Sequence, residues 1–341
     1  MNDLTYLTDH YDEKIKRIKE INAPLNFVFI TDMHNRLNMT GKGGNRPYEL
    51  AANAIRSIQY ILDRCPEISF VVSGGDIGDD YNSDSRKIRE YHHEVMDALY
   101  SLSVPVHCVI GNHDDVVGNC VDHGWDQREY VIGPEEMHDL CMKYNPTKEN
   151  YYYVDDDVHG FRYLFLNVSD HDYTMNADGK YPFHWVDEIS DRQCKWIENE
   201  ALKTDKKIIV FCHAPLHNAH IFGSEGMPDG IKPYDDMING PRMAYALEHC
   251  PNVVLYIAGH VHADNMFYES SRILSVTTLC AMAQEWAPGI PKRPIGTVNE
   301  TAFDVFSIKD NVLYVTRFGA GYDRQAQLFF DRQNGSFLPN S

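Results

Sequence analysis

Five apolar runs in this chain each end at a small or polar residue. The runs are LNFVFI before Thr31, ISFVV before Ser73, VPVHCVI before Gly111, KIIVFC before His213, and NVVLYIA before Gly259. Short, nearly continuous apolar runs bounded by turn residues are typical of strands buried inside a sheet. The pattern therefore predicts a core that contains these five strands.

Stretches of helical periodicity lie between and around these strands. Apolar residues with the spacing of one helix face occur at Leu50, Ala54, Ile55, Ile58, Ile61 and Leu62. Further helices are predicted over 86–102 and 191–202, an amphipathic helix within 1–24, and another strand over 162–168. Strands that alternate with helices predict an α/β fold.

The pattern changes after residue 262. The segments MFYES, RILSVTT, TAFDVFSI and NVLYVTRFG are typical of strands, and short polar links join them, including a hairpin turn at 309–311. We therefore expect residues 263–341 to add mainly antiparallel strands that complete a second sheet.

Metal-binding side chains follow all five core strands. They are Asp32 and His34, Asp76, Asn112, His213, and His260 with His262. Ligands bind at the carboxyl ends of the strands in open α/β sheets, so we expect these side chains to converge on one pocket. Gly75, Gly111 and Gly259 directly precede ligands, where glycine lets the backbone pass close to a bound ion. Because the ligands come from distant segments, we expect one domain over residues 1–341.

The donor types favour borderline metals over calcium. Imidazole suits Zn, Mn and Fe, whereas carboxylate and amide oxygens suit harder ions. The side chains of Asp32 and His34, and those of His260 and His262, are two residues apart, which places each pair on one side of an extended backbone. Each pair can reach one metal or two neighbouring ones, and two metals roughly 3.5–4 Å apart recur in phosphatases and nucleases. The pattern predicts a hydrolytic site for two divalent or mixed-valence ions, with Mn, Fe and Zn all open.

The motifs D-x-H, G-D, G-N-H-D, H and G-H-x-H follow one another from Asp32 to His262. This ordered set resembles the calcineurin-like metallophosphoesterase superfamily, and the resemblance covers most of the chain. It implies a four-layer αββα sandwich, with two mixed β-sheets flanked by helices and a dinuclear metal site at the carboxyl edge of the strands. It also implies two ligand sets that share Asp76 as a bridge: Asp32, His34, Asp76 and His262 for one metal, and Asp76, Asn112, His213 and His260 for the other.

The resemblance implies a mechanism as well. A hydroxide shared by the metals would attack phosphorus in line, because a dication lowers the pKa of water toward roughly 7. His113 would be the general acid that protonates the leaving alcohol, and Asp114 would orient it. Substrate-binding candidates are Arg36, Asn112 and His217. The implied activity is hydrolysis of a small phosphodiester, such as a cyclic nucleotide; the alternatives are a phosphomonoesterase for a small metabolite and a non-catalytic metal-binding scaffold.

Two departures from related patterns disfavour two subgroups of the superfamily, the phosphoprotein phosphatases and the enzymes with a coloured Fe–tyrosinate site. Protein phosphatases of the superfamily have an arginine shortly after G-N-H-D/E, where this chain has Asp115, Val116, Val117 and Gly118. Purple acid phosphatases use a tyrosine three residues after the G-D aspartate, where this chain has Asp79. The order of motifs looks more like that of the bacterial phosphodiesterases of the superfamily.

Three segments near the ligands, 115–150, 170–190 and 214–240, are expected to be loops that shape the pocket. Their aromatic and histidine side chains are candidates for its rim: His123, Trp125, Tyr173, His184, Trp185, His217, His220 and Tyr234. His107, His138 and His249 lie outside any motif, and we interpret them as ordinary core or surface residues. Asp79 and Asp80 are interpreted as part of a solvated loop. The glycine-rich stretch 41–44 is also interpreted as a loop, because it lacks the motif of a phosphate-binding loop.

Composition limits the partners and the compartment. The 31 Lys and Arg against 50 Asp and Glu leave a formal charge of −19, which repels long nucleic acid and disfavours a nuclease. The eight cysteines include no C-x-x-C pair, which favours buried, reduced thiols. The polar N-terminal segment has neither the apolar core of a signal peptide nor the length of a membrane span, so we expect a cytoplasmic protein. Nothing in the sequence predicts the oligomeric state.

Overall fold

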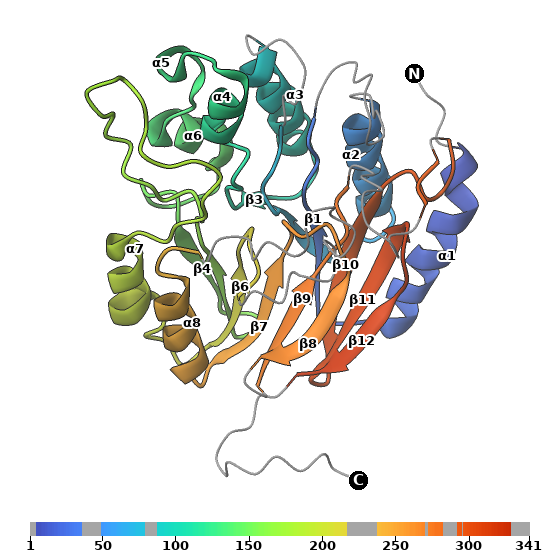
Figure 1. Ribbon diagram of the computed structural model, residues 1–341. Helices are drawn as coiled ribbons and strands as arrows, with labels where there is room; N and C mark the ends of the chain where they lie inside the picture. Colours follow the sequence, from blue (N-terminus) through green and yellow to red (C-terminus); the bar gives the residue numbers. More distant parts are fainter. Residues whose placement is uncertain are drawn as a thin grey trace.

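Two six-stranded mixed sheets form the centre of the molecule (Figure 1). The computed structural model describes residues 5–35, 49–78, 87–216, 237–269, 272–281, 292–294 and 296–328. The first sheet has the strand order β12-β11-β10-β1-β2-β3, with bounds β1 Leu25–Ile30, β2 Ile68–Ser73, β3 Val106–Cys108, β10 Ala302–Lys309, β11 Val312–Gly319 and β12 Arg324–Gln327. The second has the order β4-β5-β6-β7-β9-β8, with bounds β4 Tyr152–Asp156, β5 Phe161–Phe165, β6 Lys207–Phe211, β7 Val253–Ala258, β8 Asn265–Glu269 and β9 Ile273–Thr277.

All five predicted core strands lie in these sheets, and each runs parallel to at least one neighbouring strand. Strands β1, β2 and β3 pair in parallel in the first sheet, and β5, β6, β7 and β9 do so in the second. Because parallel strands end at the same edge, their carboxyl ends bring segments distant in sequence to one place. The predicted α/β fold with two mixed sheets is confirmed.

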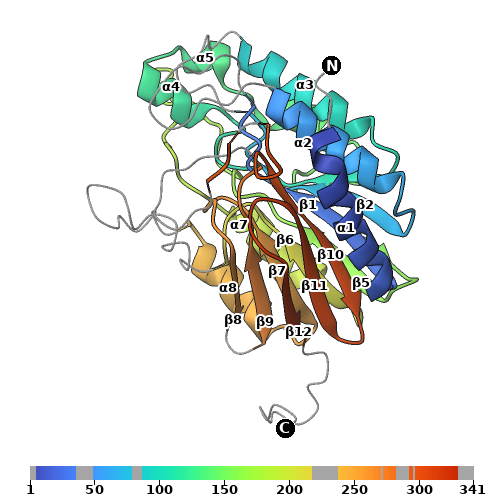
Figure 2. The same ribbon diagram turned by 90° about the vertical axis from the view of Figure 1, so that its right-hand side faces the viewer.

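Helices cover both outer faces, which gives four layers. Figure 2 shows α1, α2 and α3 on one side of the sheets and α8 on the other. The helices have these bounds: α1 Thr5–Ile21, α2 Glu49–Leu62, α3 Ile88–Tyr100, α4 Val117–His123, α5 Gln127–Tyr130, α6 Pro134–Cys141, α7 Asp191–Trp196, the π-helical turn η2 Ile197–Ala201, and α8 Gly240–His249. The four helical regions predicted from periodicity correspond to α1, α2, α3 and α7 with η2. Among the described residues, no helix is long and apolar enough to cross a membrane.

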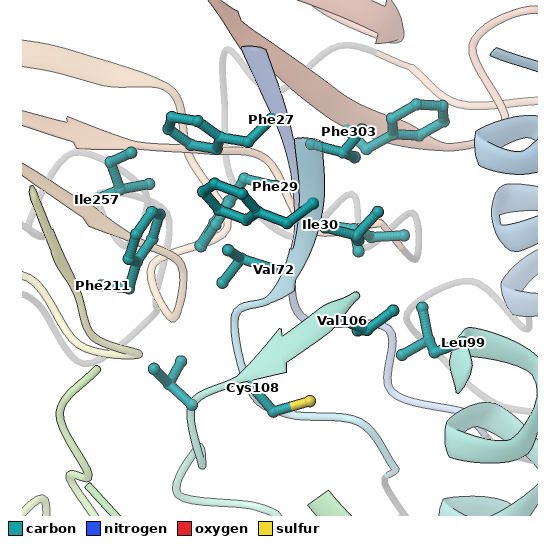
Figure 3. Close-up of a cluster of buried hydrophobic side chains, with 14 of the residues drawn as sticks. Phe27, Phe29, Ile30, Val72, Leu99, Val106, Cys108, Phe211, Ile257 and Phe303 are labelled. Carbon is teal, nitrogen blue, oxygen red and sulfur yellow. The ribbon is translucent and has the colours of Figure 1, made fainter. Parts of the chain in front are cut away.

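The alternation of side chains along the strands separates two cores. Ile209 and Phe211 of β6 belong to the cluster between the sheets, whereas Ile208 and Val210 pack with the helices α7 and α8. Figure 3 shows Phe27, Phe29, Phe211 and Ile257 together in the inner cluster, where the rings of Phe27 and Phe211 are 5.5 Å apart. Strands buried on both faces need apolar residues at every position, which explains the continuous apolar runs.

The strands after residue 263 do not all complete one sheet, and that expectation is wrong. Strands β8 and β9 join the sheet of β4–β7, whereas β10, β11 and β12 join the sheet of β1–β3. The reason is that β10 pairs antiparallel with β1, which satisfies the edge that β1 would otherwise leave open. The hairpin at 309–311 is confirmed: Asp310 and Asn311 have φ of 50° and 62°, and the positive pair suits a tight two-residue turn.

The segment 115–150 is not the continuous loop that we expected. It contains α4, α5 and α6, which lie beyond the end of β3 (Figure 1). These helices are too short for periodicity to reveal them. All eight cysteines are buried, and their reduced state stays a prediction. A single domain over 1–341 stays a prediction.

Candidate active site

Two groups of metal-binding side chains lie side by side at the carboxyl edge of the strands. The first group comprises Asp32, His34, Asp76 and His262, and the second comprises Asp76, His213 and His260. In each group, the ligand atoms all lie within 4.8 Å of one another. Tertiary structure thus brings together the residues that the motifs singled out, and both groups contain Asp76.

The carboxylate of Asp76 faces both groups with one oxygen. Its Oδ2 lies 3.6 Å from His34 Nε2 in the first group and 3.2 Å from His213 Nε2 in the second. Its Oδ1 accepts a hydrogen bond of 3.0 Å from the backbone N–H of His113. This bond fixes the carboxylate and leaves Oδ2 between the two groups, which is the geometry a bridging ligand requires.

The first group draws on both sheets. Asp32 and His34 follow β1, and His262 follows β7. His262 Nε2 lies 3.0 Å from Asp32 Oδ1 and 3.1 Å from His34 Nε2. The closeness of two imidazole nitrogens and two carboxylates at one point suits a cation that all four could bind.

Asn112 lies beside the second group. Its Oδ1 lies 3.1 Å from His213 Nε2 and 3.0 Å from His260 Nδ1. The other ring nitrogen of His213 is 2.8 Å from the carbonyl oxygen of Gly74, and such a bond fixes the tautomer that leaves Nε2 available for a metal. The donor set is therefore one of mixed nitrogen and oxygen, as the sequence predicts, and it fits Mn, Fe or Zn.

Unusual backbone angles aim these side chains. Asp32, His34, Asp76, His260 and His262 all have positive φ, between 40° and 65°. Non-glycine residues avoid this region because of steric conflict. Hydrogen bonds between strand ends hold the conformation, including Asp32 N–H to the Gly75 carbonyl at 3.0 Å and His34 N–H to the Asp76 carbonyl at 3.0 Å.

Burial and charge perturb the titration of the site in opposite ways. Burial lowers the pKa of His213, but the negative charge and hydrogen bond of Asp76 outweigh it and raise the pKa to about 10. Burial, followed by repulsion from His213, lowers the pKa of His260 to about 3. For Asp32, burial is opposed by the charge of His262, and the pKa falls to about 2. The site therefore holds buried carboxylates that need positive charge, which a proton or a metal can supply.

Asp114 binds the backbone. Its Oδ2 accepts hydrogen bonds from the N–H groups of Asp76 at 3.0 Å and Gly111 at 2.8 Å, and its Oδ1 accepts one from Ile77 at 2.7 Å. These bonds tie the end of β2 to the loop after β3. They give Asp114 a direct role in holding two ligand segments together, whereas its orientation of His113 stays a prediction.

Two residues of the segment 170–190 reach the site, and no motif predicts their positions. The ring of Trp185 lies 4.4 Å from the ring of His113, measured between centroids. Asp187 Oδ2 lies 3.8 Å from His260 Nε2, and burial raises the pKa of Asp187 to about 7. The aromatic and histidine content of the segment is the signal that placed Trp185 among the rim candidates; for Asp187 the sequence offers no signal.

The other rim candidates lie in supporting contacts or outside the described residues. Tyr173 donates a hydrogen bond to Asp115 at 2.9 Å, His184 Nε2 lies 3.0 Å from Asp122, and His123 stacks on Trp125. Predicted residues outside the described ranges are Arg36, Asp79, Asp80, His217, His220, Tyr234 and the stretch 41–44. Arg36 and His217 therefore stay candidates from sequence alone.

Comparison with known proteins agrees with this site. The family model for calcineurin-like phosphoesterases matches residues 25–264. A solved dimetal phosphatase from Danio rerio is 17% identical, covers 89% of this chain and 99% of its own, and has a TM-score of 0.58, which shows a shared fold. A search of the curated proteins finds no match.

Two further solved structures are more distant. Phosphopantetheinyl hydrolase from Mycobacterium tuberculosis is 13% identical, with 76% of this chain and 90% of that chain covered and a TM-score of 0.39. A 5'-nucleotidase from Candida albicans is 14% identical, with 84% and 48% covered and a TM-score of 0.43. At these TM-scores neither structure bears on the fold. The family match, which spans most of the chain and all five ligand segments, is decisive: the chain belongs to the calcineurin-like phosphoesterase family and is a metal-dependent phosphoric ester hydrolase.

Proposed function

We propose that this protein hydrolyses a small phosphodiester at a site for two metal ions. The observation that carries the proposal is the pair of donor groups that share Asp76. We assign Asp32, His34, Asp76 and His262 to one ion, and Asp76, Asn112, His213 and His260 to the other. Two ions bound there would supply a nucleophilic water at neutral pH and offset the negative charge of the phosphate.

His113 is the general acid of the proposed reaction. Its backbone N–H is bonded to Asp76, so the residue that follows the ligand Asn112 is held beside the bridging carboxylate. Its imidazole is 5.0 Å from that of His34, measured between ring centroids. From this place a protonated imidazole can donate to the leaving oxygen, a contribution of typically 10²–10⁴-fold in rate.

The charge of the surroundings favours a diester over a monoester. Asp115 and Asp187 are acidic groups near the ligands in addition to Asp32 and Asp76, and burial raises the pKa of both. A phosphodiester carries one negative charge, whereas a monoester carries close to two at neutral pH. Added negative charge in a buried site therefore penalises the monoester more. The absence of an arginine shortly after Asp114 in the sequence supports the same choice.

The runner-up is a phosphomonoesterase acting on a small metabolite, and a non-catalytic metal-binding scaffold is the less favoured alternative. His113 and the seven proposed metal ligands are all present, which favours catalysis over the scaffold. We further propose a small-molecule substrate in place of long nucleic acid, because the chain carries a formal charge of −19. We also propose a cytoplasmic location, which suits eight buried cysteines kept as reduced thiols.

The deciding experiment compares bis-p-nitrophenyl phosphate with p-nitrophenyl phosphate. Metal-stripped protein is reloaded separately with Mn, Fe, Zn and Ni, and metal content is measured on the same samples. We expect about two ions per chain and a preference for the diester. Preference for the monoester would replace the diesterase assignment by the runner-up. Two bound ions without turnover of either ester would favour the scaffold.

A further inference from the structure

The imidazole of His113 lies against an indole that the family motifs do not include. The rings of His113 and Trp185 are 4.4 Å apart between centroids and inclined by 53°. The ring of His113 also lies edge-on to the ring of His34, with 5.0 Å between the centroids and 88° between the ring planes. Two aromatic neighbours at such separations restrict the rotation of a ring.

The indole of Trp185 is itself held in place. Its Nε1–H donates a hydrogen bond of 2.9 Å to Asp122 Oδ2, and Asp122 Oδ1 lies 3.0 Å from His184 Nε2. The ring packs so closely on Gly118 that a Cβ at that residue would lie 2.3–2.5 Å from three ring carbons. Any larger side chain at residue 118 would therefore clash with the indole in this position.

The backbone around Trp185 is fastened to the sheet. Glu188 N–H donates to the Val168 carbonyl at 2.6 Å, just beyond β5, and Ile238 N–H donates to the Asp187 carbonyl at 2.9 Å. Trp185 has a φ of 50°, a conformation that a bulky residue avoids and that persists only where its surroundings impose it. The surrounding contacts thus hold Trp185 in an unfavourable backbone conformation that places its indole against His113.

We propose that Trp185 is a positioning residue that holds the His113 imidazole toward the leaving group. The proposal rests on the assignment of His113 as general acid under the proposed function. Asp114, the expected orienting residue, accepts three backbone N–H groups, whereas Trp185 contacts the imidazole itself. Without the indole, His113 gains rotational freedom and spends less time aligned with the leaving oxygen, and a misplacement of about 1 Å can cost about 10²-fold in rate.

The test measures how strongly the rate depends on the leaving group. Diaryl phosphodiesters with p-nitrophenol and with phenol as leaving groups are compared for the wild type, Trp185→Ala, His113→Ala and the double variant, all metal-loaded with content verified. Proton donation matters more for the poorer leaving group, phenol. We expect Trp185→Ala to lose about 10- to 100-fold in kcat on the phenyl ester and much less on the nitrophenyl ester. We also expect it to retain its metals and to add nothing to the His113→Ala loss.

Two further variants protect the test against misfolding. Asp122→Ala removes an exposed acceptor, so the indole loses its hydrogen bond but keeps its packing on Gly118. This variant should show the same selectivity with a smaller loss. Trp196→Ala removes an indole that packs on Tyr151 and Tyr153, away from the ligands, and should keep the wild-type ratio between the two esters.

The outcomes separate the two proposals. If His113→Ala slows both esters equally, the general-acid assignment fails and the positioning role fails with it. If His113→Ala is selective while Trp185→Ala and Asp122→Ala are not, the general acid stands and the positioning role is overturned. A double variant that is far slower on the phenyl ester than His113→Ala would also overturn it, because Trp185 would then act independently of His113.

Discussion

Single residues at the strand ends determine the chemistry of this site, and many of them adopt a backbone conformation that their residue type avoids. Asp32, Asp76 and His260 are examples with φ of 52–65°. A left-handed conformation costs about 1–2 kcal/mol for a residue with a side chain, so the fold stores strain where ligands gather. Such strain is typical of functional sites and is offset by the stability of the rest of the protein.

Replacing Asp76 by Asn tests the bridging assignment. The amide keeps the shape but removes the negative charge from Oδ2, which faces His34 and His213. We expect metal content to fall below two ions per chain and kcat to fall by more than about 10²-fold, since even outer-shell changes cost 10–100-fold in metal sites. Metal analysis and hydrolysis rates are the measurements. Asp157→Asn, at an exposed surface pair with Lys206, is the matched control. Full activity of the Asp76 variant would contradict a bridging role.

Gly259 tests how tightly the ligands are packed. A Cβ at this position would lie 2.1 Å from Thr31 Oγ1 and 2.4 Å from Asp32 Oδ2. Gly259→Ala must therefore displace Asp32, and we expect weaker metal binding together with a loss of about 1–3 kcal/mol in unfolding free energy from overpacking. Metal titration and urea unfolding measure the two effects. Gly133→Ala, where a Cβ would meet nothing within 4 Å, should leave metal binding unchanged. Wild-type metal affinity in Gly259→Ala would show that Asp32 is free to move.

Strands and helices carry the residues to their places, and their periodicity is the part of this fold that the sequence predicts well. Helix α7 begins at Asp191 because the Ser190 side chain accepts a hydrogen bond from Gln193 N–H, which satisfies a free donor of the first turn. The helices α4, α5 and α6 were not predicted, since seven, four and eight residues give too few turns for an apolar face to repeat. Tertiary contacts stabilise such short helices.

His107 in β3 provides a pH-dependent test at this scale. It is a core residue, stacked on Phe165 and 3.1 Å from the Tyr152 hydroxyl, and burial lowers its pKa to about 4. In the unfolded chain, His107 has a pKa near 6.5 and binds a proton below that pH. In the folded protein, it binds the proton only below about pH 4. Stability should therefore fall as the pH drops through this window, by up to about 3 kcal/mol from this residue.

Urea unfolding of the wild type and His107→Phe at pH 8, 6, 5 and 4 measures this contribution. The difference in unfolding free energy between the two proteins at pH 8 serves as the reference. At that pH, His107 is neutral in both the folded and the unfolded state of the wild type. As the pH falls, the variant should lose less stability than the wild type. A difference that is constant from pH 8 to pH 4 would show that His107 is protonated equally in both states.

At the scale of the whole molecule, a buried ion-pair network links the C-terminal strands to the metal site. Arg317 in β11 donates to Asp304 in β10 at 2.7 Å and to Asp264 at 2.6 Å, and Asp264 lies two residues after the proposed ligand His262. Arg324 in β12 donates to Asp304 at 2.9 Å. The network therefore ties strands β10, β11 and β12 to the segment that carries the proposed ligand His262.

Arg317→Met should destabilise the protein by about 3 kcal/mol, the lower end of the cost of breaking a buried pair from one side. The buried Asp304 keeps Arg324 as a partner but loses part of the positive charge that compensates it. Urea unfolding measures the loss. Arg128→Met, which removes an exposed pair with Asp126, should keep the wild-type unfolding midpoint. A loss below about 1 kcal/mol for Arg317→Met would mean that water or other groups replace the network.

Local pattern alone determined which segments become core strands and which side chains stand at their ends, because buried strands require continuous apolar runs and the ligand motifs are contiguous in sequence. The α/β class, the positions of β1, β2, β3, β6 and β7, and the hairpin turn at Asp310 and Asn311 all follow from it. Tertiary structure alone decided that β10 pairs with β1, that Asp76 Oδ2 faces both donor groups, that Trp185 packs on His113 in particular, and that Asp187 reaches the site. These features join residues far apart in the chain, and no local preference specifies a contact whose energy exists only once both partners are in place.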